Sequence, residues 1–330
     1  MATFGVLGAT SWGMTLAALL ERNGHRVVVL VRTADEADRV SADRGISRLP
    51  EVRLGETARV VPASQAVPIE GLIVAVPAQS VRKSVEDCGA LRGLAVLSAA
   101  KGLERGGNLR VTEVLAECGW EPELTATISG PNLAHEIAKG LPAAAVVAAR
   151  SPDVATLWQQ ALSGAMFRVY TSEDVVGVEL AGAMKNVAAI AAGAARGLEF
   201  GDNTVASIMT RGLAEMTRLG VAMGADALTF QGLAGVGDLA ATCFSNLSRN
   251  SRFGALLARG NGTAEALAAI GESVEGAETA AVALELGARY AVELPITEQV
   301  AAVVAGERTV PEAMAQLLTR RLTGETAPRP

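Results

Sequence analysis

Short hydrophobic runs, separated by glycine, proline and polar residues, fill the first half of the chain. The run at residues 26–31, Arg-Val-Val-Val-Leu-Val, is rich in β-branched side chains and is typical of a strand buried on both faces. Before it, residues 14–23 have helical spacing, and Gly24 stands where helices commonly end. The runs that we predict to be strands are residues 3–7, 26–31, 71–76, 94–99, 124–129 and 143–149.

The order of these elements predicts the fold of this half. A strand, a turn, a helix and a second strand occupy residues 1–31, which is the pattern of a βαβ unit of about 30 residues. Strands that alternate with helices favour an α/β fold, here a Rossmann-like, doubly wound parallel sheet.

The pattern changes after residue 178. Hydrophobic residues there recur with helical spacing, and no comparable β-branched run follows. We therefore predict a Rossmann-like domain at residues 1–178 and an all-α domain at residues 179–330, which ends in a loose polar tail at residues 323–330. The helices predicted for the second domain are residues 178–195, 204–223, 251–259, 279–288 and 297–305.

The composition narrows the classes of protein and partner. Half of the 330 residues are hydrophobic but only 3% are aromatic, so the core must be aliphatic. A net charge of −6 argues against nucleic acid as a partner, because that would require clustered Lys and Arg. Three cysteines, with a spacing that fits neither a zinc site nor a disulfide framework, predict a reducing, cytoplasmic location. The two histidines lie far apart in the sequence, and we predict no metal site.

The uncharged N-terminal stretch has two interpretations. Residues 1–20 carry no charged side chain, as in a signal peptide or a membrane span. Glycines and hydroxyl side chains interrupt the stretch, and no basic residue precedes it. A strand, a glycine turn and a helix explain it better, and we predict no integral membrane segment.

The segment Gly8-Ala9-Thr10-Ser11-Trp12-Gly13 lies between the first strand and the first helix, the place of a dinucleotide-binding turn. There the N–H groups and partial positive charge of a helix N-terminus can bind a pyrophosphate. Thr10 stands where the second glycine of the usual pattern lets the phosphate approach, and an ordinary strand–helix turn is the alternative. The predicted cofactor contacts in the turn are Gly8, Thr10, Ser11, Trp12 and Gly13.

The residue after the second strand bears on the choice of cofactor. NAD-selective sites usually place Asp or Glu there to hold the ribose hydroxyls, whereas this chain has Arg32. A guanidinium suits a 2′-phosphate, so Arg32 favours NADP(H), unless it is simply a solvated arginine. The expected cofactor is therefore NADP or NAD.

Four further segments place polar residues in apolar, glycine-rich surroundings, and a fifth, Ser248-Arg249-Asn250, follows them. The four are residues 98–104, 129–136, 178–186 and 232–243. Together with the glycine turn, these segments resemble the NAD(P)-dependent sn-glycerol-3-phosphate dehydrogenases over about residues 4–299. The resemblance implies a Rossmann domain that faces a helical domain, in an enzyme that interconverts dihydroxyacetone phosphate and glycerol 3-phosphate for phospholipid synthesis.

The resemblance also implies the catalytic roles. Lys185, on an apolar helix, matches the family's general acid/base lysine; it would donate a proton to the carbonyl oxygen while hydride passes from nicotinamide C4 to the carbonyl carbon. Lys101 would hold and polarise the substrate oxygens, and Asp238 would orient Lys185. From the residues alone, either lysine could be a surface cation, and Asp238 could equally be a helix N-cap.

The other predicted contacts follow from the same resemblance. Arg249 and Asn250 would hold the substrate phosphate in an otherwise acidic protein, although a Ser-Arg-Asn triplet is more often a polar loop. Asn132 stands where the family usually has Ser or Thr. The predicted substrate contacts are Lys101, Gly130, Asn132, Lys185, Asn186, Asp238, Thr242, Ser248, Arg249 and Asn250. The further predicted cofactor contacts are Lys101, Ala134, Arg249, Ser273 and Glu275.

Two other functions are compatible with these features. One is a related two-domain reductase of another oxo substrate, and the other is a catalytically silent NADP-binding redox sensor, because a fold does not settle function. Ser248-Arg249-Asn250, with Lys101 and Lys185, provides for a phosphate and so argues against the other reductase. The complete set of Lys101, Lys185, Asp238 and Arg249 argues against a sensor, which would not need it. The expected partner is a small molecule, and a homodimer is left open.

Overall fold

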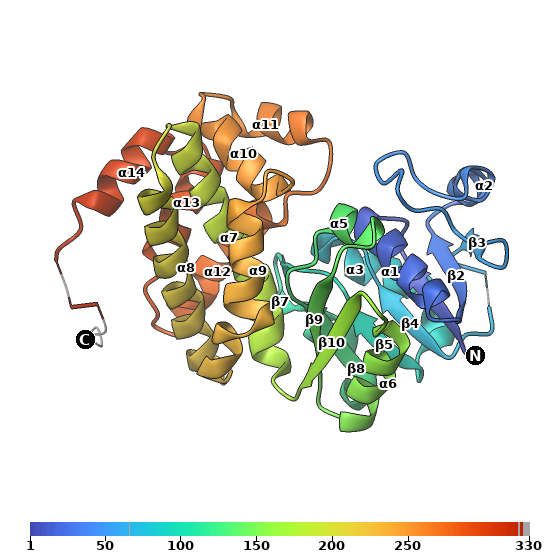
Figure 1. Ribbon diagram of the computed structural model, residues 1–330. Coiled ribbons are helices and arrows are strands. Elements are labelled where there is room, and N and C mark those ends of the chain that lie inside the picture. The colour runs from blue at the N-terminus through green and yellow to red at the C-terminus, as the bar shows by residue number, and fades with distance from the viewer. Residues whose placement is uncertain (66, 323, 326–330) are drawn as a thin grey trace.

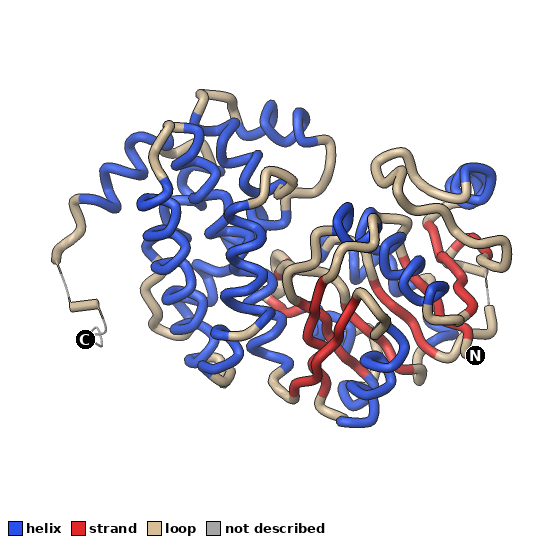
Figure 2. Tube along the Cα trace, viewed as in Figure 1, coloured by secondary structure: helices blue, strands red, loops and turns tan. Residues whose placement is uncertain are grey.

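The computed structural model describes residues 1–65, 67–322 and 324–325. It has two halves (Figure 1), a sheet with flanking helices from the first part of the chain and a group of helices from the second. Figure 2 shows the strands gathered in the first half and helices throughout the second. The predicted α/β domain followed by an all-α domain is confirmed. Of the predicted tail, residues 323 and 326–330 lie outside the described residues.

The main sheet has eight strands in the order β10-β9-β8-β5-β4-β1-β2-β3. Strands β1 to β5 and β8 run parallel to one another, whereas β9 is antiparallel to β8 and β10 is parallel to β9. The strands are β1 (Thr3–Leu7), β2 (Arg26–Val31), β3 (Arg59–Pro62), β4 (Gly71–Val74), β5 (Ala95–Ser98), β8 (Thr125–Ser129), β9 (Ala143–Ala149) and β10 (Phe167–Ser172). A separate hairpin contains β6 (Leu103–Glu104) and β7 (Leu109–Arg110).

The prediction of a parallel sheet is right for most strands and wrong for β9 and β10, which run opposite to the rest. The helix between β8 and β9, α5 (Ala134–Ala138), is too short to carry the chain back along the sheet, so β9 starts at the edge where β8 ends. The hydrophobic pattern also misses the edge strands β3 and β10. In β10, exposed Arg168 and Tyr170 alternate with buried residues, so no continuous hydrophobic run marks the strand.

Helices cover both faces of the sheet. One hydrophobic cluster joins α1 and α6 to one face, and a second joins α3 and α4 to the other. Strand order reverses between β1 and β4, and ligands of open α/β sheets bind at the carboxyl edge of such a switch point. The helices of this half are α1 (Ser11–Arg22), α2 (Ala34–Asp43), α3 (Val81–Glu86), α4 (Val111–Glu117), α5 and α6 (Pro152–Leu162).

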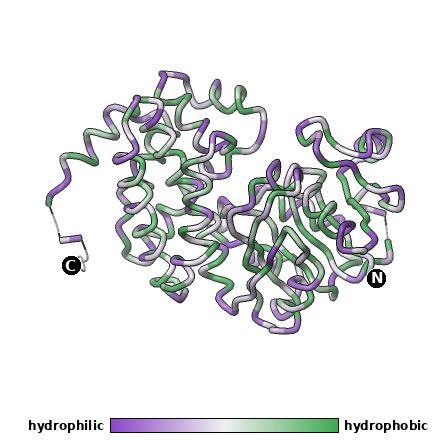
Figure 3. The backbone as a smooth tube through the Cα atoms, viewed as in Figure 1, coloured by the Kyte–Doolittle hydropathy of each residue, from purple (hydrophilic) through white to green (hydrophobic). Residues whose placement is uncertain are grey.

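The centre of the second half is α7 (Val175–Gly197), which packs against several helices and against β8 and β9. By length and composition α7 could cross a membrane, and it is the only such helix in the described part of the chain. Because 89% of its most apolar window is buried, it serves as the core helix of this fold. Hydrophobic residues run through both halves (Figure 3), as an aliphatic core requires.

The remaining helices of this half surround α7. All five predicted helices are present, as α7, α8, α10, α12 and α13, whereas the shorter α9, α11 and α14 were not predicted. The predicted domain boundary after residue 178 falls inside α7 and stays a prediction. The bounds are α8 (Asp202–Ala222), α9 (Asp238–Phe244), α10 (Arg249–Ala258), α11 (Thr263–Ile270), α12 (Glu275–Arg289), α13 (Pro295–Val304) and α14 (Val310–Leu318).

Two glycines allow α7 and α10 to cross at close range. A Cβ atom on Gly193 of α7 would overlap with the carbonyl group of Ser251, and one on Gly254 of α10 would overlap with the carbonyl oxygen of Ile190. The absence of side chains at these two positions sets the distance between the helices, and with it the position of the N-terminal end of α10.

We expect Gly193→Ala to lower the free energy of unfolding by about 1–3 kcal/mol, because the added methyl group forces α7 and α10 apart. Urea denaturation followed by circular dichroism measures this change. Gly262→Ala is the matched control, since a Cβ atom there would have nothing within 4 Å. An equal loss in both variants would contradict close helix packing as the cause.

Candidate active site

The glycine turn after β1 is shaped by the loop that follows β4. Gly8 has a φ of +109°, and a Cβ atom there would lie 2.9 Å from the carbonyl oxygen of Ala75. A Cβ atom on Gly13 would overlap with the carbonyl oxygen of Gly8. Gly8 is therefore required by backbone conformation and Gly13 by close approach, and the turn meets the β4 loop at the switch point.

Thr10, the departure from the usual dinucleotide pattern, has a structural role. Its hydroxyl accepts a hydrogen bond from the Gly13 N–H at 3.0 Å and donates one to the carbonyl oxygen of Ala75 at 2.7 Å. Thr10 is thus the N-cap of α1 and also ties this helix to the β4 loop. The side chain is held by contacts within the protein, which explains why a threonine is accommodated in the turn.

The start of α1 suits a pyrophosphate group. The first N–H groups of a helix have no acceptor within the helix. Thr10 takes the N–H of Gly13, which leaves those of Ser11 and Trp12 for an anion. The Trp12 ring packs against Phe167, with ring centroids 6.5 Å apart, so Trp12 would offer its backbone. This donor set fits the phosphates of a nicotinamide dinucleotide.

Two lysines and one aspartate meet at the carboxyl edge of the sheet. Lys101, in the loop after β5, and Lys185, in the middle of α7, donate to opposite oxygens of Asp238 at the start of α9. Both Nζ–Oδ distances are 2.7 Å. Lys185 and Asp238 are buried, whereas Lys101 keeps 15% of its side chain exposed. The structure therefore brings together the three residues predicted to be catalytic, with Lys101 on the open side.

Asp238 acts as the counter-ion of these lysines, although it lies in the first turn of α9. The sequence alone left a helix N-cap as an equal interpretation, but the residue at the N-cap position is Gly237. A π-helical turn, Leu233–Gly237, leads directly into Asp238. Such turns are rare and are frequently found at functional sites.

Burial and charge both act on the ionisable groups of the cluster. Burial lowers the pKa of Lys101 to about 8; Asp238 opposes this shift and Lys185 adds to it. Burial by itself would raise the pKa of Asp238, but the neighbouring Lys101 and Lys185 hold it below its usual value. Two lysines thus face a single carboxylate, and this excess of positive charge suits an anionic substrate.

Neighbouring oxygens complete the lysine contacts. Thr242 Oγ1 accepts from Lys185 Nζ at 2.7 Å and donates to the carbonyl oxygen of Asp238 at 2.6 Å. The carbonyl oxygen of Gly130 accepts from Lys101 Nζ at 2.8 Å. Ser129, which the sequence analysis did not single out, places its Oγ 3.5 Å from Asp238 Oδ2. A polar residue at the last position of a buried strand is the signal that could have identified it.

Asn186 and Asn250 connect the Lys101 loop to the helical half. Asn186 donates to the carbonyl oxygen of Lys101 at 2.8 Å and accepts from Asn250 at 2.9 Å. Asn250 in turn accepts from the Gly276 N–H at 3.0 Å. Both asparagines are buried, so this chain of amides fixes the loop that carries Lys101 relative to α10 and α12.

Glu275, the first residue of α12, reaches across to the sheet half. Its Oε1 accepts from the Ala78 N–H at 3.2 Å, and a Cβ atom on Gly102 would overlap with its other oxygen. Burial raises the pKa of Glu275, while the Ala78 N–H and the nearby Arg249 act in the opposite direction. This predicted cofactor residue therefore lies beside the Lys101 loop and the switch point.

The predicted phosphate clamp begins α10. Ser248 is the N-cap of this helix, and its hydroxyl accepts from the Ser251 N–H at 3.2 Å. Arg249 places its Nη1 3.5 Å from Glu272 Oε2 and keeps 41% of its side chain exposed. The hydroxyl of Ser248 is thus engaged within the helix, whereas Arg249 is accessible to a ligand.

Four other predicted residues make no hydrogen bond or ion pair with the two lysines or Asp238 in the described part of the chain. Arg32 has an 86% exposed side chain, and its Nε lies 3.6 Å from Glu36. Asn132 donates to the carbonyl oxygen of Ala144 at 3.3 Å, which anchors its loop to β9. The other two are Ala134, which begins α5 beside α1, and Ser273, which is exposed in the loop before α12.

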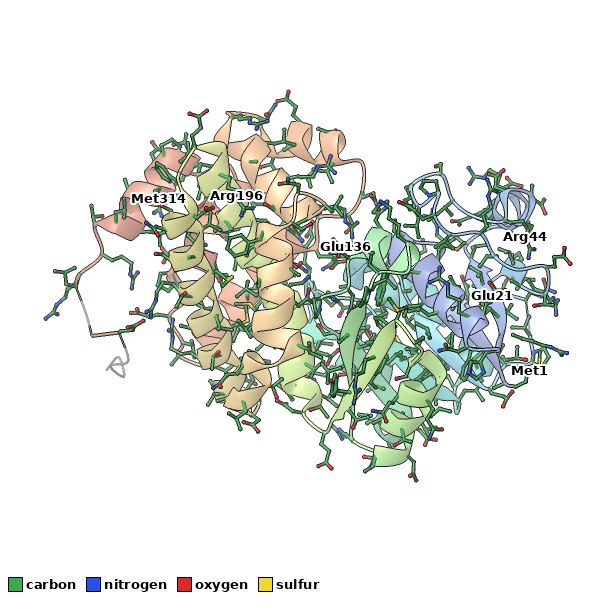
Figure 4. All side chains as sticks on the ribbon, viewed as in Figure 1. Met1, Glu21, Arg44, Glu136, Arg196 and Met314 are labelled. Atoms are coloured by element: carbon green, nitrogen blue, oxygen red, sulfur yellow. The ribbon has the colours of Figure 1, made fainter. Side chains whose placement is uncertain are left out.

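Figure 4 shows side chains from both halves near their boundary, where Glu136 of α5 is labelled. A separate cavity of about 410 Å³ lies between α4 and the start of α7, where Arg110 and Asp174 are among the residues that line it. None of the predicted site residues lines this cavity in the described part of the chain. The three residues predicted to be catalytic therefore lie outside this cavity, at the carboxyl edge of the sheet.

Comparison with known proteins gives one consistent family. Residues 3–155 match the model for the NAD-dependent glycerol-3-phosphate dehydrogenase N-terminus, and residues 174–315 match the model for the C-terminus of the same enzyme. A glycerol-3-phosphate dehydrogenase [NAD(P)+] from Moorella thermoacetica is 42% identical over 327 residues, which cover 97% of this chain and 96% of that protein. One from Streptomyces coelicolor is 43% identical and covers 96% of each chain.

A solved structure is also similar over nearly the whole chain. The glycerol-3-phosphate dehydrogenase from Coxiella burnetii superimposes with a TM-score of 0.90 at 35% sequence identity, covering 97% of this chain and 99% of that one. The relative arrangement of the sheet and the helical half is therefore shared with that enzyme.

We expect Asp238→Asn to lower the free energy of unfolding at pH 6 by about 3 kcal/mol, because two buried lysines lose their counter-ion. Asp238 opposes the lowering of the Lys101 pKa, so its loss moves this pKa below about 8. A lysine whose pKa is depressed in the folded state destabilises the fold while it is protonated, and this cost decreases as the pH rises above that pKa. The deficit relative to wild type should therefore be smaller at pH 9 than at pH 6.

Urea denaturation of wild type and variant at the two pH values measures this difference. Asp38→Asn, at an exposed position of α2, controls for the general effect of removing one negative charge. A deficit that does not change with pH would contradict the coupling between Asp238 and Lys101.

Proposed function

Because the chain belongs to the family of NAD(P)-dependent glycerol-3-phosphate dehydrogenases, we propose that it reduces dihydroxyacetone phosphate to sn-glycerol 3-phosphate and so supplies phospholipid synthesis. Members of this family are oxidoreductases that act on a CH–OH group with NAD(P) as cofactor. The observation that carries the proposal is the buried Asp238 carboxylate shared by Lys101 and Lys185 at the carboxyl edge of the sheet. This arrangement provides a proton donor and a positive field for a ketone that bears a phosphate.

Lys185 is the proposed proton donor. When bound, the reduced nicotinamide would supply hydride. The carbonyl oxygen, which gains negative charge, would take a proton from the Lys185 ammonium group. Asp238 and Thr242 each hold Nζ of Lys185 at 2.7 Å, which fixes the direction of the donor. In the reverse direction the same nitrogen would accept the proton.

Lys101 and Arg249 are proposed to bind the substrate anion. Lys101 is the more exposed lysine of the cluster, so its ammonium can face both the carbonyl oxygen and the rest of the substrate. Arg249, with its accessible guanidinium, suits the phosphate through charged, directional hydrogen bonds. In this proposal Asn186 and Asn250 support the Lys101 loop and offer amide groups at the substrate side.

The remaining expectations also belong to this proposal. Arg32, exposed at the end of β2, supports a preference for NADP(H). The three cysteine thiols are unpaired, as is usual in a reducing compartment, and this supports a cytoplasmic location. A homodimer stays a prediction.

We expect Lys185→Ala to lower kcat for dihydroxyacetone phosphate by about 100-fold or more, because the proton donor is lost. The affinity for NADPH should change by less than about twofold, since the lysine acts on the reacting oxygen. Turnover is followed by the absorbance of NADPH and binding by its fluorescence.

Lys83→Ala, at an exposed position of α3, is the matched control for loss of a lysine. Near-normal turnover in Lys185→Ala would remove this residue from the mechanism. A wild-type protein that binds NADPH but oxidises none of it with dihydroxyacetone phosphate would instead favour a redox sensor.

We expect kcat/KM for dihydroxyacetone phosphate to fall as the pH rises above about 8, because Lys101 then loses the proton that makes it cationic. Lys101→Arg keeps the positive charge at high pH, so its remaining activity should decline only at a higher pH. Profiles of kcat/KM from pH 6 to 10 for both proteins test this. A wild-type profile that stays flat across pH 8 would contradict a role for the charge of Lys101.

A further inference from the structure

The carboxylate of Glu272 joins the two halves of the protein beside the glycine turn. Glu272 Oε2 lies 3.5 Å from Nη1 of Arg249 and 4.0 Å from Nε of Arg48. Arg249 begins α10 in the helical half, whereas Arg48 belongs to the loop after α2 in the sheet half. The Arg48–Glu272–Arg249 bridge therefore spans the two halves.

Arg48 is also attached to the cofactor turn itself. Its Nη2 donates a hydrogen bond of 2.5 Å to the carbonyl oxygen of Ala9, the residue between Gly8 and Thr10. The same turn presents the N–H groups of Ser11 and Trp12 at the start of α1. Arg48 thus lies beside the donors that suit the phosphates of a dinucleotide.

The three side chains of the bridge remain accessible to a ligand. The exposed fractions of the side chains are 45% for Arg48, 34% for Glu272 and 41% for Arg249. Ion pairs at such exposed positions are weak, worth about 0–1 kcal/mol. A phosphate group, which carries charge and several acceptor oxygens, can therefore replace the carboxylate of Glu272 as the partner of both guanidinium groups.

From this arrangement we infer that Glu272 is an internal competitor for the phosphates of the nicotinamide dinucleotide. In the free protein its carboxylate occupies Arg48 and Arg249, and the arriving phosphates displace it. Arg48 then acts as a further cofactor-binding cation, in addition to the predicted Arg32 and Arg249. The inference rests on the proposed function only in taking the glycine turn as the dinucleotide site.

The position of Glu272 favours such an exchange. It lies between Gly271, which ends α11 with a φ of +71°, and Glu275, which holds the Ala78 N–H across the boundary. The segment is thus anchored on both sides, while the Glu272 side chain is free to turn toward solvent. A bound phosphate would also repel Glu272, so cofactor binding and the bridge oppose each other.

The binding of NADPH and of NADH, measured by the fluorescence of the reduced nicotinamide without any substrate, tests the inference. We expect Glu272→Gln to tighten NADPH binding by about 3- to 10-fold at low salt, with a smaller gain at 0.5 M salt because screening weakens the competition. Arg48→Gln should weaken binding, and adding Glu272→Gln to it should yield a smaller gain than in the wild-type background. An equal gain with both cofactors would assign the exchange to the diphosphate, and a gain with NADPH alone to the 2′-phosphate.

Glu265→Gln, at an exposed position of α11, is the control for removal of one negative charge from the same part of the molecule. The inference is overturned if Glu272→Gln binds both cofactors no more tightly than Glu265→Gln does. It is also overturned if Arg48→Gln leaves binding unchanged. Because dihydroxyacetone phosphate is absent from these measurements, a failure of the proposed reaction would not alter their outcome.

Discussion

The organisation of this protein depends on one carboxylate that two lysines share. Burying an ammonium group without a partner is strongly unfavourable, and Asp238 provides both Lys101 and Lys185 with a partner at 2.7 Å. The three residues come from the β5 loop, α7 and α9, so the ion pairs also join the sheet half to the helical half. The pairing that makes the lysines tolerable in the interior would also align them for the proposed reaction.

Other contacts hold the same edge of the sheet in place. The amide chain through Asn186 and Asn250 supports the backbone of Lys101, and Glu275 holds the loop after β4. The contacts of Asn186 and Glu275 each link an element of the helical half to a loop at the carboxyl end of a parallel strand. The position of the site thus follows from the topology of the sheet, and the helical half supplies the groups that complete it.

An acidic protein that binds anions has to place its cations locally and keep them paired. Arg32 lies beside Glu36, Arg249 and Arg48 share Glu272, and both predicted catalytic lysines contact Asp238. The buried pairs are short and fixed, whereas the pairs around the glycine turn are longer and exposed. This difference fits the roles proposed for them, since a catalytic ammonium group needs a constant position and a phosphate ligand needs partners that can be exchanged.

The sequence by itself determined the elements whose signals are local. Periodicity and β-branched runs marked β1, β2, β4, β5 and β8 and the long helices, because each element buries a face of its own residues. The motifs and their order indicated the family, and with it Lys101, Lys185 and Asp238 as candidates. Only the tertiary structure decided what lies opposite each side chain, since these partners are distant in sequence. The antiparallel direction of β9, the hydrogen bond from Thr10 to the β4 loop, Asp238 as counter-ion rather than cap, and Glu272 between two arginines all depend on such contacts between distant residues, which a local sequence pattern does not reveal.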